Sequence, residues 1–487
     1  MRLNLLFIIK TLGSILILET VFLLIATGVA FAYGGSDEKP MLISSIVMGV
    51  AGLALFIAGY KANEYRAGRR EGMLTVSLTW IILSFFGMLP FYLGGYIDNI
   101  TDAFFETMSG FTTTGATVIN NVEALPRGIL FWRSLTQWEG GIGVIVFSVA
   151  LLPMFGGGAS HLYDSEATGF THERFRPRVT QVAKRLSGIY LLLTILITFF
   201  LWIGPMDFFD ALNHAMSSIS TGGYSTKNIS VAYWDSSYIE CVLMFSMCMG
   251  SMKLQLFYFA LKGNFKQLKN DEETRWYLVY LLIMTGITIC WLLVNGFLSG
   301  QVDALSVIQK SAFQVISLAS TTGFTTVDYV SWGQFFWLIA IILMLICGCG
   351  GSTSGGMKMG RAMIVVKNMF NEFKKQTHPT AVLPVRVNGR AVSQEIIRRV
   401  HVFVLVYLII IVFSWAVLLI SGLTFDEALG TAMTAMSNVG PSLGLLESGN
   451  LYDIPTASKW YVAILMIVGR LEIFTILTIL LPGFWKR

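Results

Sequence analysis

One short pattern occurs four times in this chain, each time centred on a glycine. The first copy reads MSGFTTTGAT and runs from Met108 to Thr117. Further copies begin at Met216, Ile316 and Met433. The copies align without a gap on Gly115, Gly223, Gly323 and Gly440, with hydroxyl or amide side chains two residues away on either side, ending in Thr117, Ser225, Thr325 and Ser442. A repeat length of about 100 residues indicates four related units in series.

Long apolar stretches flank every copy. The chain is 54% hydrophobic and only 13% charged, which excludes an ordinary soluble fold and indicates an all-α polytopic membrane protein. Segments able to cross about 30 Å of hydrocarbon as helices are predicted at 11–32, 41–60, 73–96, 129–154, 182–204, 237–261, 276–299, 334–349, 400–421 and 458–482. The five cysteines lack disulfide or metal spacing, so we predict reduced packing residues.

The first apolar segment has two interpretations. Ala30, Phe31 and Ala32 look like the cleavage site of a signal peptide. The run is long for such a peptide and contains Glu19, so a retained transmembrane helix is favoured.

The basic residues predict the topology. Most of the 34 Lys and Arg residues lie at the two termini or within 61–70, 156–185, 262–275 and 358–399, on alternate sides of consecutive spans. Both termini are therefore predicted to be cytoplasmic, and the four glycine loops are predicted to face outward.

Between the two spans of each unit, the sequence predicts a helix of about three turns, too short to cross a bilayer at about 1.5 Å per residue. Asp102, Asp210 and Glu427 favour helix starts in three units, whereas Lys310 takes this position in the third. We predict re-entrant helices followed by extended glycine loops. Such backbone is tolerated at membrane depth only where it is buried in protein or lines a water-filled cavity.

Four such loops in one chain can surround a common axis. Glycine accepts backbone angles that other residues resist, so carbonyl groups can replace the hydration shell of a cation. The C-terminal ends of the short helices also favour a cation. The alternative is that small and hydroxyl residues only pack helices together, but four copies in register favour an ion pathway.

Three further stretches are FWRSLTQWEGGIG (Phe131–Gly143), GCGGSTSGGMK (Gly348–Lys358) and GRLEIFT (Gly469–Thr475). Together with the four loops, they resemble the Trk/Ktr/HKT superfamily of potassium transporters over essentially the whole chain. The resemblance implies K⁺ uptake across a bacterial or archaeal cytoplasmic membrane through a gated, channel-like pore, with no nucleotide bound by this chain. The rival interpretations are a K⁺ symporter coupled to H⁺ or Na⁺ and, more remotely, a membrane-embedded enzyme, for which HExxH and GxSxG are absent.

The resemblance also implies an architecture. It predicts two N-terminal helices and four helix–pore-helix–helix units in a pseudo-fourfold arrangement around one pore, with boundaries at 1–72, 73–160, 161–265, 266–375 and 376–487. A homodimer and a cytosolic TrkA-like nucleotide-binding ring are the implied partners, without nucleic acid. The basic loop 358–399 is a candidate docking surface for that ring, although ordinary positive-inside charge explains it equally well.

The resemblance assigns roles to individual residues. The K⁺ selectivity filter comprises Thr113, Thr114, Gly115, Thr221, Gly222, Gly223, Thr321, Thr322, Gly323, Asn438, Val439 and Gly440. The gate comprises Gly348, Gly350, Gly351, Ser352, Thr353, Ser354, Gly355, Gly356, Lys358 and Arg470. A helix so rich in glycine should unwind. A phosphate-cradling loop is disfavoured because Met357 stands where a Walker motif needs Lys.

Arg470 is implied to lie below the filter as an electrostatic barrier, and the alternative is a structural salt bridge with Glu472 or another acid. The chain departs from the family at Lys253, where Gly-Gly-x-Asn-Phe is usual. Lys253 follows Gly223 by the same number of residues as Arg470 follows Gly440. We hypothesise that Glu139 offsets Lys253, with snorkelling toward the cytoplasm as the alternative.

Three lesser predictions complete the set. The fourth loop has Asn438 and Pro441 in place of the usual residues, which predicts looser discrimination between K⁺ and Na⁺. His214 is predicted to be a hydrogen-bonded packing residue. Glu106 and Glu123 either attract cations at the outer mouth or are ordinary solvated side chains.

Overall fold

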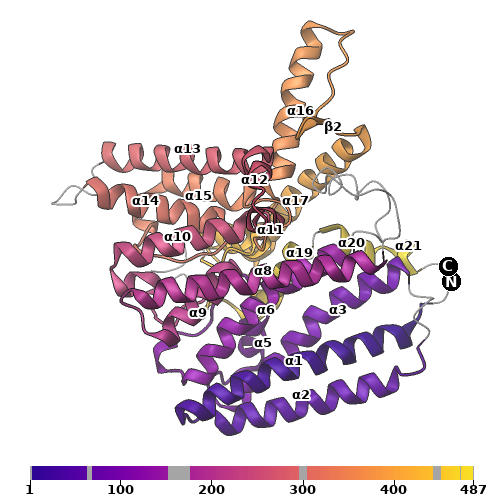
Figure 1. Ribbon diagram of the computed structural model, residues 1–487, viewed down its shortest axis with the longest axis vertical. Helices are drawn as coiled ribbons and strands as arrows, with labels where there is room; N and C mark the ends of the chain where they lie inside the picture. Colours follow the sequence, from indigo (N-terminus) through magenta and orange to yellow (C-terminus); the bar gives the residue numbers. More distant parts are fainter. Residues whose placement is uncertain are drawn as a thin grey trace.

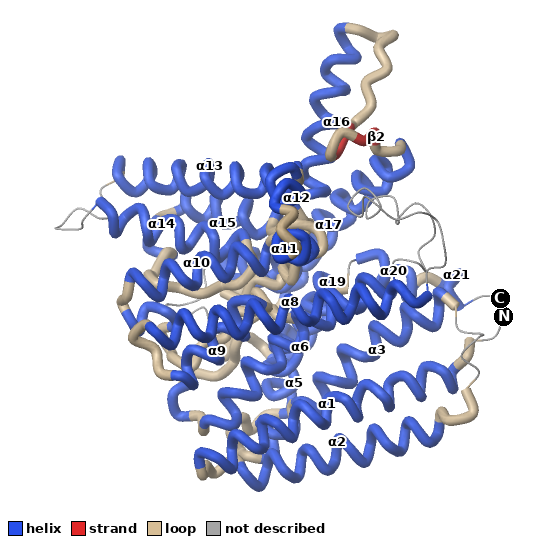
Figure 2. The backbone as a smooth tube through the Cα atoms, in the orientation of Figure 1, coloured by secondary structure: helices blue, strands red, loops and turns tan. Residues whose placement is uncertain are grey.

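The computed structural model describes residues 3–62, 68–151, 176–295, 304–441, 451–471 and 473–485. Within these ranges, the chain is helical apart from one short antiparallel hairpin, β1 (Arg386–Val387) and β2 (Arg390–Ala391) (Figure 2). The predicted all-α class is confirmed. The predicted Ser442 position, Glu472 and the loop segment 156–175 lie outside the described residues.

Two long helices begin the chain, α1 (Leu5–Tyr33) and α2 (Glu38–Ala58), and they pack side by side (Figure 1). Ile8 of α1 and Phe484 of α21 (Pro482–Trp485) belong to one apolar cluster. The beginning and end of the chain therefore lie on the same side of the molecule.

After α2, the order of a long helix, a short buried helix and a second helix occurs four times; we call these stretches repeats 1 to 4. The long helices are α3 (Arg69–Gly87), which continues into α4 (Leu89–Leu93), α8 (Arg176–Ile203), α13 (Glu272–Val294) and α17 (Gln394–Ile420). The short helices are α5 (Ile100–Phe111), α9 (Phe208–Ile219), α14 (Ala304–Ala319) and α18 (Phe425–Ser437). The second helices are α6 (Arg127–Leu151), α10 (Ser237–Ser251), α15 (Gln334–Ile346) and α19 (Thr456–Arg470).

Side-chain caps start three of the short helices, α5, α9 and α18. Asn99 caps α5 by accepting a hydrogen bond from the Thr101 N–H at 2.9 Å, and Asp207 caps α9 by accepting one from the Asp210 N–H at 2.8 Å. In α18, Thr424 and Glu427 form a capping box. The acids predicted to favour these starts, Asp102, Asp210 and Glu427, each stand three residues after the capping residue, in the first turn, where they complement the helix dipole.

Among the described residues, six helical stretches are long and apolar enough to cross a membrane, namely α1, α2, Arg70–Leu93, Gln181–Ile203, α13 and α17. Two predicted spans are wrong as continuous helices. The segment 237–261 bends by 103° between α10 and α11 (Leu254–Leu261), and the segment 458–482 bends by 117° between α19 and α20 (Ile473–Leu480). The α10 bend coincides with tertiary contacts, because the carbonyls of Gly250 and Ser251 accept hydrogen bonds from Thr353 and Cys349 instead of from a further helical turn.

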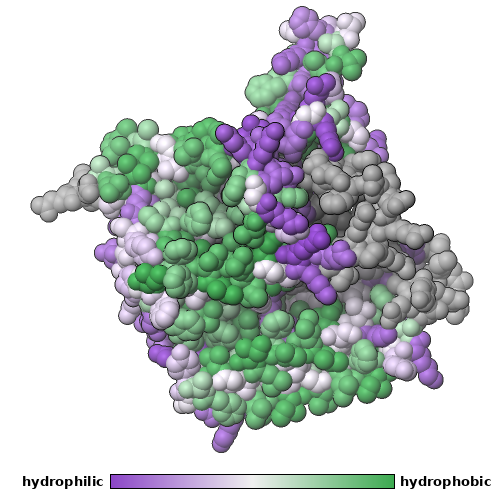
Figure 3. Space-filling view, in the orientation of Figure 1, coloured by the Kyte–Doolittle hydropathy of each residue, from purple (hydrophilic) through white to green (hydrophobic). Residues whose placement is uncertain are grey.

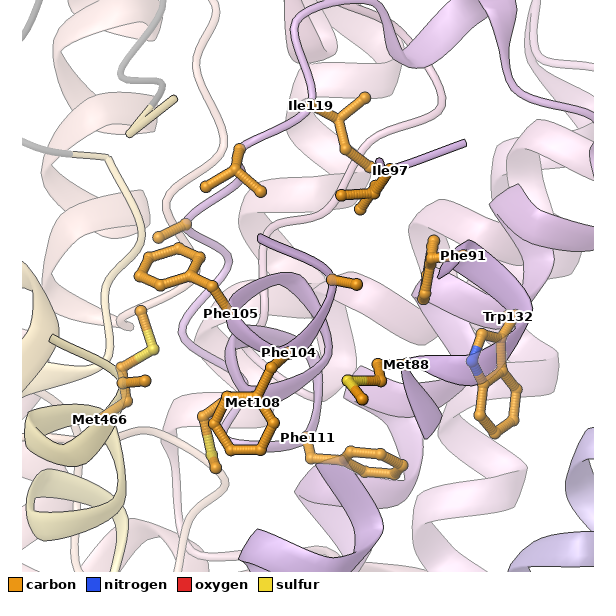
Figure 4. Close-up of a cluster of buried hydrophobic side chains, with 14 of the residues drawn as sticks. Met88, Phe91, Ile97, Phe104, Phe105, Met108, Phe111, Ile119, Trp132 and Met466 are labelled. Atoms are coloured by element: carbon orange, nitrogen blue, oxygen red, sulfur yellow. The ribbon is translucent and has the colours of Figure 1, made fainter. Parts of the chain in front are cut away.

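The first short helix is embedded in side chains rather than in lipid. Figure 4 shows Phe104, Phe105 and Met108 of α5 between Met466 of α19 and Trp132 of α6. Every residue of α5 from Thr101 to Phe111 is buried. Burial on all sides explains why this helix ends inside the molecule without spanning it.

Apolar side chains cover the outer flanks of the long helices (Figure 3), as for Leu282 of α13 at 73% exposure. An exposed apolar surface of this extent fits contact with lipid.

Cys241 and Cys290 are exposed, so the prediction of buried packing is wrong for them and confirmed for Cys347 and Cys349. The α16 helix (Met359–Thr377) and the hairpin together protrude from the rest of the molecule (Figure 1).

Candidate functional site

Each short helix is followed, within two residues of its end, by a residue with left-handed backbone angles. The φ values are 52° at Thr113, 56° at Thr221, 64° at Thr321 and 55° at Asn438. In every repeat, the N–H of the next residue donates back to the carbonyl five positions earlier, as from Thr114 to Ser109 at 2.9 Å. β-branched residues rarely adopt these angles, so the same uncommon turn occurs four times.

The glycines that follow adopt φ between 80° and 99°. A Cβ on any of them would lie less than 3.0 Å from a carbonyl oxygen of the next loop. For Gly115, Gly223, Gly323 and Gly440 in turn, these oxygens belong to Gly222, Thr322, Val439 and Thr114. The contacts run from repeat 1 through repeat 4 and return to repeat 1, so the four loops close a ring around each other.

Hydroxyl groups line the turns. The side chains of Thr112 and Thr114 are hydrogen-bonded at 2.8 Å, as are those of Ser320 and Thr322. In repeat 4, Asn438 donates from Nδ2 to Thr114 Oγ1 at 2.9 Å. The residue that departs from the repeat pattern therefore joins the last loop to the first.

Gln137 of α6 fixes the second loop. Its Nε2 donates to the Gly222 carbonyl at 2.7 Å, while its Oε1 accepts from Ser217 Oγ at 2.6 Å and from the Tyr224 N–H at 3.1 Å. The prediction of site residues missed Gln137. The available signal was its place inside the FWRSLTQWEGGIG stretch.

Glu106 is buried behind the first loop and does not act at an outer mouth, so both interpretations of this residue are wrong. Its carboxylate accepts from Arg133 at 2.8 and 2.9 Å and from the Val118 N–H at 3.0 Å. Arg133 also donates to the Ser225 carbonyl at 3.2 Å. The buried pair therefore joins the backbone segments that follow Gly115 and Gly223.

Glu123 and His214 have different surroundings. Glu123 is exposed and accepts from the Asn228 N–H at 3.0 Å, and its effect on cations stays a prediction. The imidazole of His214 is buried between the Asp210 carbonyl at 2.8 Å and Ser225 Oγ at 3.0 Å. The predicted packing role of His214 is confirmed.

A Gln137→Leu substitution is expected to reduce discrimination between K⁺ and Na⁺ several-fold, because it leaves the Gly222 carbonyl and Ser217 hydroxyl without their buried partner. Each buried polar group left unpaired costs about 1–3 kcal/mol. The measurement is competition of ⁸⁶Rb⁺ uptake by K⁺ and Na⁺ in vesicles. Thr198→Val is the control, since its hydroxyl donates within its own helix to Thr194; equal selectivity in both variants would contradict the role of Gln137.

The segment between α15 and α16 is not helical from 347 to 358, which confirms the predicted unwinding; it is named the gate segment here after the role that the resemblance implies. Positive φ values occur at Cys347, Gly351, Gly356 and Lys358. Within it, Ser352 and Ser354 bond each other at 2.8 Å, and Lys358 Nζ donates to the Ser354 carbonyl. The Met359 N–H donates to the Gly348 carbonyl at 2.8 Å.

The gate segment contacts the ends of the short helices directly. Thr353 Oγ1 donates to the carbonyl of Ile219, the last residue of α9, at 3.0 Å. The Gly355 N–H donates to Thr321 Oγ1 of the third loop at 3.0 Å. A Cβ on Gly355 would lie less than 3.0 Å from the Ser437 carbonyl oxygen in repeat 4. Repeats 2, 3 and 4 therefore meet at this one segment.

Arg470 connects the gate segment to repeat 1. Its guanidinium is buried and donates to the Thr353 carbonyl at 2.6 Å and to the Gly140 carbonyl at 3.2 Å. Arg470 forms no ion pair with any acid of the described residues, and Glu472 lies outside them. A positive charge is thus held directly against the loop beneath the ring.

The hypothesis that Glu139 offsets Lys253 is wrong. Lys253 Nζ lies 3.1 Å from Asp271 and 2.9 Å from Glu273, whereas neither carboxylate oxygen of Glu139 has a hydrogen-bond partner among the described residues. Lys253 is only 5% exposed, so snorkelling is also excluded. Lys253 and Arg470 do occupy matching places, since each flanks the bend of its repeat.

Comparisons with known proteins agree over the whole chain. A family model described as TrkH, cation transport protein, matches residues 42–483. The Trk system potassium uptake protein TrkH of Escherichia coli (strain K12) is 35% identical over 421 residues, covering 86% of each chain. The namesake of Vibrio parahaemolyticus serotype O3:K6 is 33% identical over 484 residues, covering 98% of this chain and 99% of the relative. The crystal structure of the potassium transporter TrkH from Vibrio parahaemolyticus superposes with a TM-score of 0.91 at 32% identity, covering 99% of this chain and all of the other.

Proposed function

Because this chain belongs to the TrkH family of cation transport proteins, we propose that K⁺ crosses the membrane through the ring formed by its four glycine loops. The chain is a potassium transporter and not an enzyme. The proposal specifies the path of the ion, the filter and the gate.

The main support for this proposal is that each of the four loops contacts the next and the fourth contacts the first. Each filter glycine packs against the carbonyl that precedes the glycine of the next loop, so the backbone oxygens are brought to one common axis. Carbonyl rings replace the hydration shell of K⁺ in selective filters. The filter in this proposal comprises the twelve residues assigned from sequence, at positions 113–115, 221–223, 321–323 and 438–440.

The short helices support a cation at this place. The C-terminal ends of α5, α9, α14 and α18 all lead directly into the loops. The C-terminus of a helix carries about half a negative charge. Four such ends around one axis lower the free energy of a K⁺ ion beneath the ring.

The gate segment is proposed to close the path from below. Thr353 of this segment donates a hydrogen bond to the Ile219 carbonyl at the end of α9. Gly355 lies against the Ser437 carbonyl at the end of α18. These are the carbonyls that would otherwise face the ion. Transport therefore requires the gate segment to move away from these carbonyls. Its glycines accept a wide range of backbone angles, which permits such a movement.

The wider assembly is also a proposal. We divide the chain into two N-terminal helices and four pore units at the boundaries predicted from sequence, in pseudo-fourfold arrangement. Both termini and the basic region 358–399 face the cytoplasm of a bacterial cell in this proposal. The partners are a second copy of the chain and a TrkA-like nucleotide-binding ring, which would dock on 358–399.

Flux measurements test the proposed path. Vesicles reconstituted with the chain alone should take up ⁸⁶Rb⁺, and K⁺ should compete better than Na⁺. Uptake should persist without a gradient of H⁺ or Na⁺, because the path is a pore. If uptake requires such a gradient, the symporter interpretation replaces this one; if K⁺ and Na⁺ compete equally, the selectivity assigned to the ring is wrong.

A further inference from the structure

A buried cluster of charges lies beside the gate segment and outside the filter. Lys253 stands at the bend between α10 and α11, and its Nζ lies between Asp271 at 3.1 Å and Glu273 at 2.9 Å. All three residues are at most 6% exposed. Two acids around one base leave a net negative charge, so each contact in the cluster is needed to offset the cost of burial.

Glu273 reaches from this cluster to the gate segment. Its Oε1 accepts a hydrogen bond from the Gly350 N–H at 2.7 Å. A Cβ on Gly360, at the start of α16, would lie 2.8 Å from the same oxygen. The Glu273 carboxylate is therefore packed against both ends of the gate segment.

Asp271 reaches from the cluster to the hairpin in the other direction. It caps α13 by accepting from the Thr274 N–H at 2.9 Å, and its other oxygen accepts from Asn388 Nδ2 at 3.3 Å. Asn388 lies in the turn between β1 and β2. Burial raises the pKa of Asp271, but Lys253 and the hydrogen bonds from Thr274 outweigh it and hold this pKa below the ordinary value, so the acid is ionised at neutral pH.

Further contacts hold the hairpin on α13. The Asn388 N–H donates to Glu272 Oε2 at 2.9 Å, and the Glu272 N–H donates to Asn388 Oδ1 at 2.8 Å. Lys367 of α16 pairs with Glu272 and donates to the Arg386 carbonyl at 2.7 Å. A displacement of the hairpin therefore acts directly on the residues at the start of α13.

We propose that Lys253, Asp271 and Glu273 form a latch that holds the gate segment closed and couples it to the β1–β2 hairpin. Glu273 is the positioning residue, since it acts on the ion path through Gly350. The inference rests on the proposed role of the gate segment, which it deepens by naming the contact that restrains it. A partner that displaces the hairpin would loosen the latch through Asn388 and Asp271.

Glu273→Ala is the appropriate test variant, because Lys253 keeps Asp271 as its partner and no buried charge is left alone. Glu273→Gln retains an acceptor for the Gly350 N–H and should have a smaller effect. Glu395→Ala is the control, since this acid pairs with Arg399 on an exposed helix surface.

The first measurement is labelling of the gate cysteines Cys347 and Cys349 by a water-soluble thiol reagent, mapped by mass spectrometry in the reconstituted full chain. Labelling of Cys347 and Cys349 in the denatured chain provides the reference for complete reaction. We expect labelling of the gate cysteines to rise about tenfold in Glu273→Ala, less in Glu273→Gln and not in Glu395→Ala. Unchanged labelling in Glu273→Ala would overturn the latch.

The second measurement is a double-mutant cycle of ⁸⁶Rb⁺ uptake with Asn388→Ala. Asn388→Ala alone should raise uptake, but it should add little in the Glu273→Ala background, because the connection is already broken. If the double variant raises uptake by the product of the two single effects, the proposed coupling between the latch and the hairpin is wrong. Increased labelling without K⁺-competed uptake in any variant would support the latch and overturn the proposed ion path, which separates the two failures.

Discussion

A Gly223→Ala variant is expected to lose at least about nine-tenths of its K⁺-competed ⁸⁶Rb⁺ uptake. Gly223 has φ of 82°, and a Cβ there would lie less than 3.0 Å from the Thr322 carbonyl oxygen. Left-handed angles at a residue other than glycine cost about 1–3 kcal/mol, and the clash displaces a carbonyl of the ring. A tenfold loss of rate corresponds to only about 1.4 kcal/mol.

The matched control is Gly188→Ala in α8, where an added Cβ meets nothing within 4 Å. Both variants add one methyl group to a membrane-embedded glycine. Uptake and competition should be unchanged in the control, and both proteins should be recovered from membranes in similar amounts. Normal, K⁺-selective uptake by Gly223→Ala would show that the second loop is not part of the ion path.

Replacing Arg470 is expected to have a large effect of the opposite sign. Arg470→Ala removes a buried positive charge and both hydrogen bonds, to the Thr353 carbonyl and to the Gly140 carbonyl. Two unit charges 4 Å apart repel by about 4 kcal/mol at an effective dielectric constant of 20. We therefore expect ⁸⁶Rb⁺ uptake by the chain alone to increase about tenfold or more.

A second variant separates the two causes. Arg470→Lys keeps the charge but cannot direct two planar N–H groups at two carbonyls, so we expect uptake between that of the wild type and that of Arg470→Ala. Arg399→Ala is the control, because Arg399 is an exposed residue paired with Glu395. If Arg470→Ala conducts no better than this control, Arg470 is neither a barrier nor a restraint on the gate segment.

The loops were predictable because their information is local. Positive φ values occur where the repeat places Thr113, Thr221, Thr321 and Asn438, and again at the four glycines. Glycine and asparagine accept left-handed angles and therefore mark the turn within a few residues, whereas the three Thr residues adopt angles that β-branched side chains disfavour. The gate segment was predictable for the same reason, since several glycines in one stretch weaken any helix.

The buried charges were not predictable from spacing. Glu106 was assigned to an outer mouth or to solvent, but it pairs with Arg133 from another helix. Lys253 was matched to Glu139, but its partners Asp271 and Glu273 belong to the next repeat. Gln137 gave no signal apart from lying in a family-like stretch. The partner of a buried polar or charged side chain depends on which helix packs against it. Hydrophobic periodicity along the sequence does not contain that information.

The sequence by itself therefore determined the membrane class, the four repeats, the turns that precede the four repeated glycines and the unwinding of the segment 347–358, because each depends on composition or on residues close together in the chain. The tertiary structure alone decided the bends in repeats 2 and 4, the closed order of the loops and the partners of Lys253, Glu106 and Arg470. In α10, for example, the helix ends at Ser251 because its carbonyl accepts from Cys349, about a hundred residues away. The last carbonyls of a helix lack a donor from their own helix, and only the folded arrangement brings this distant donor to the Ser251 carbonyl.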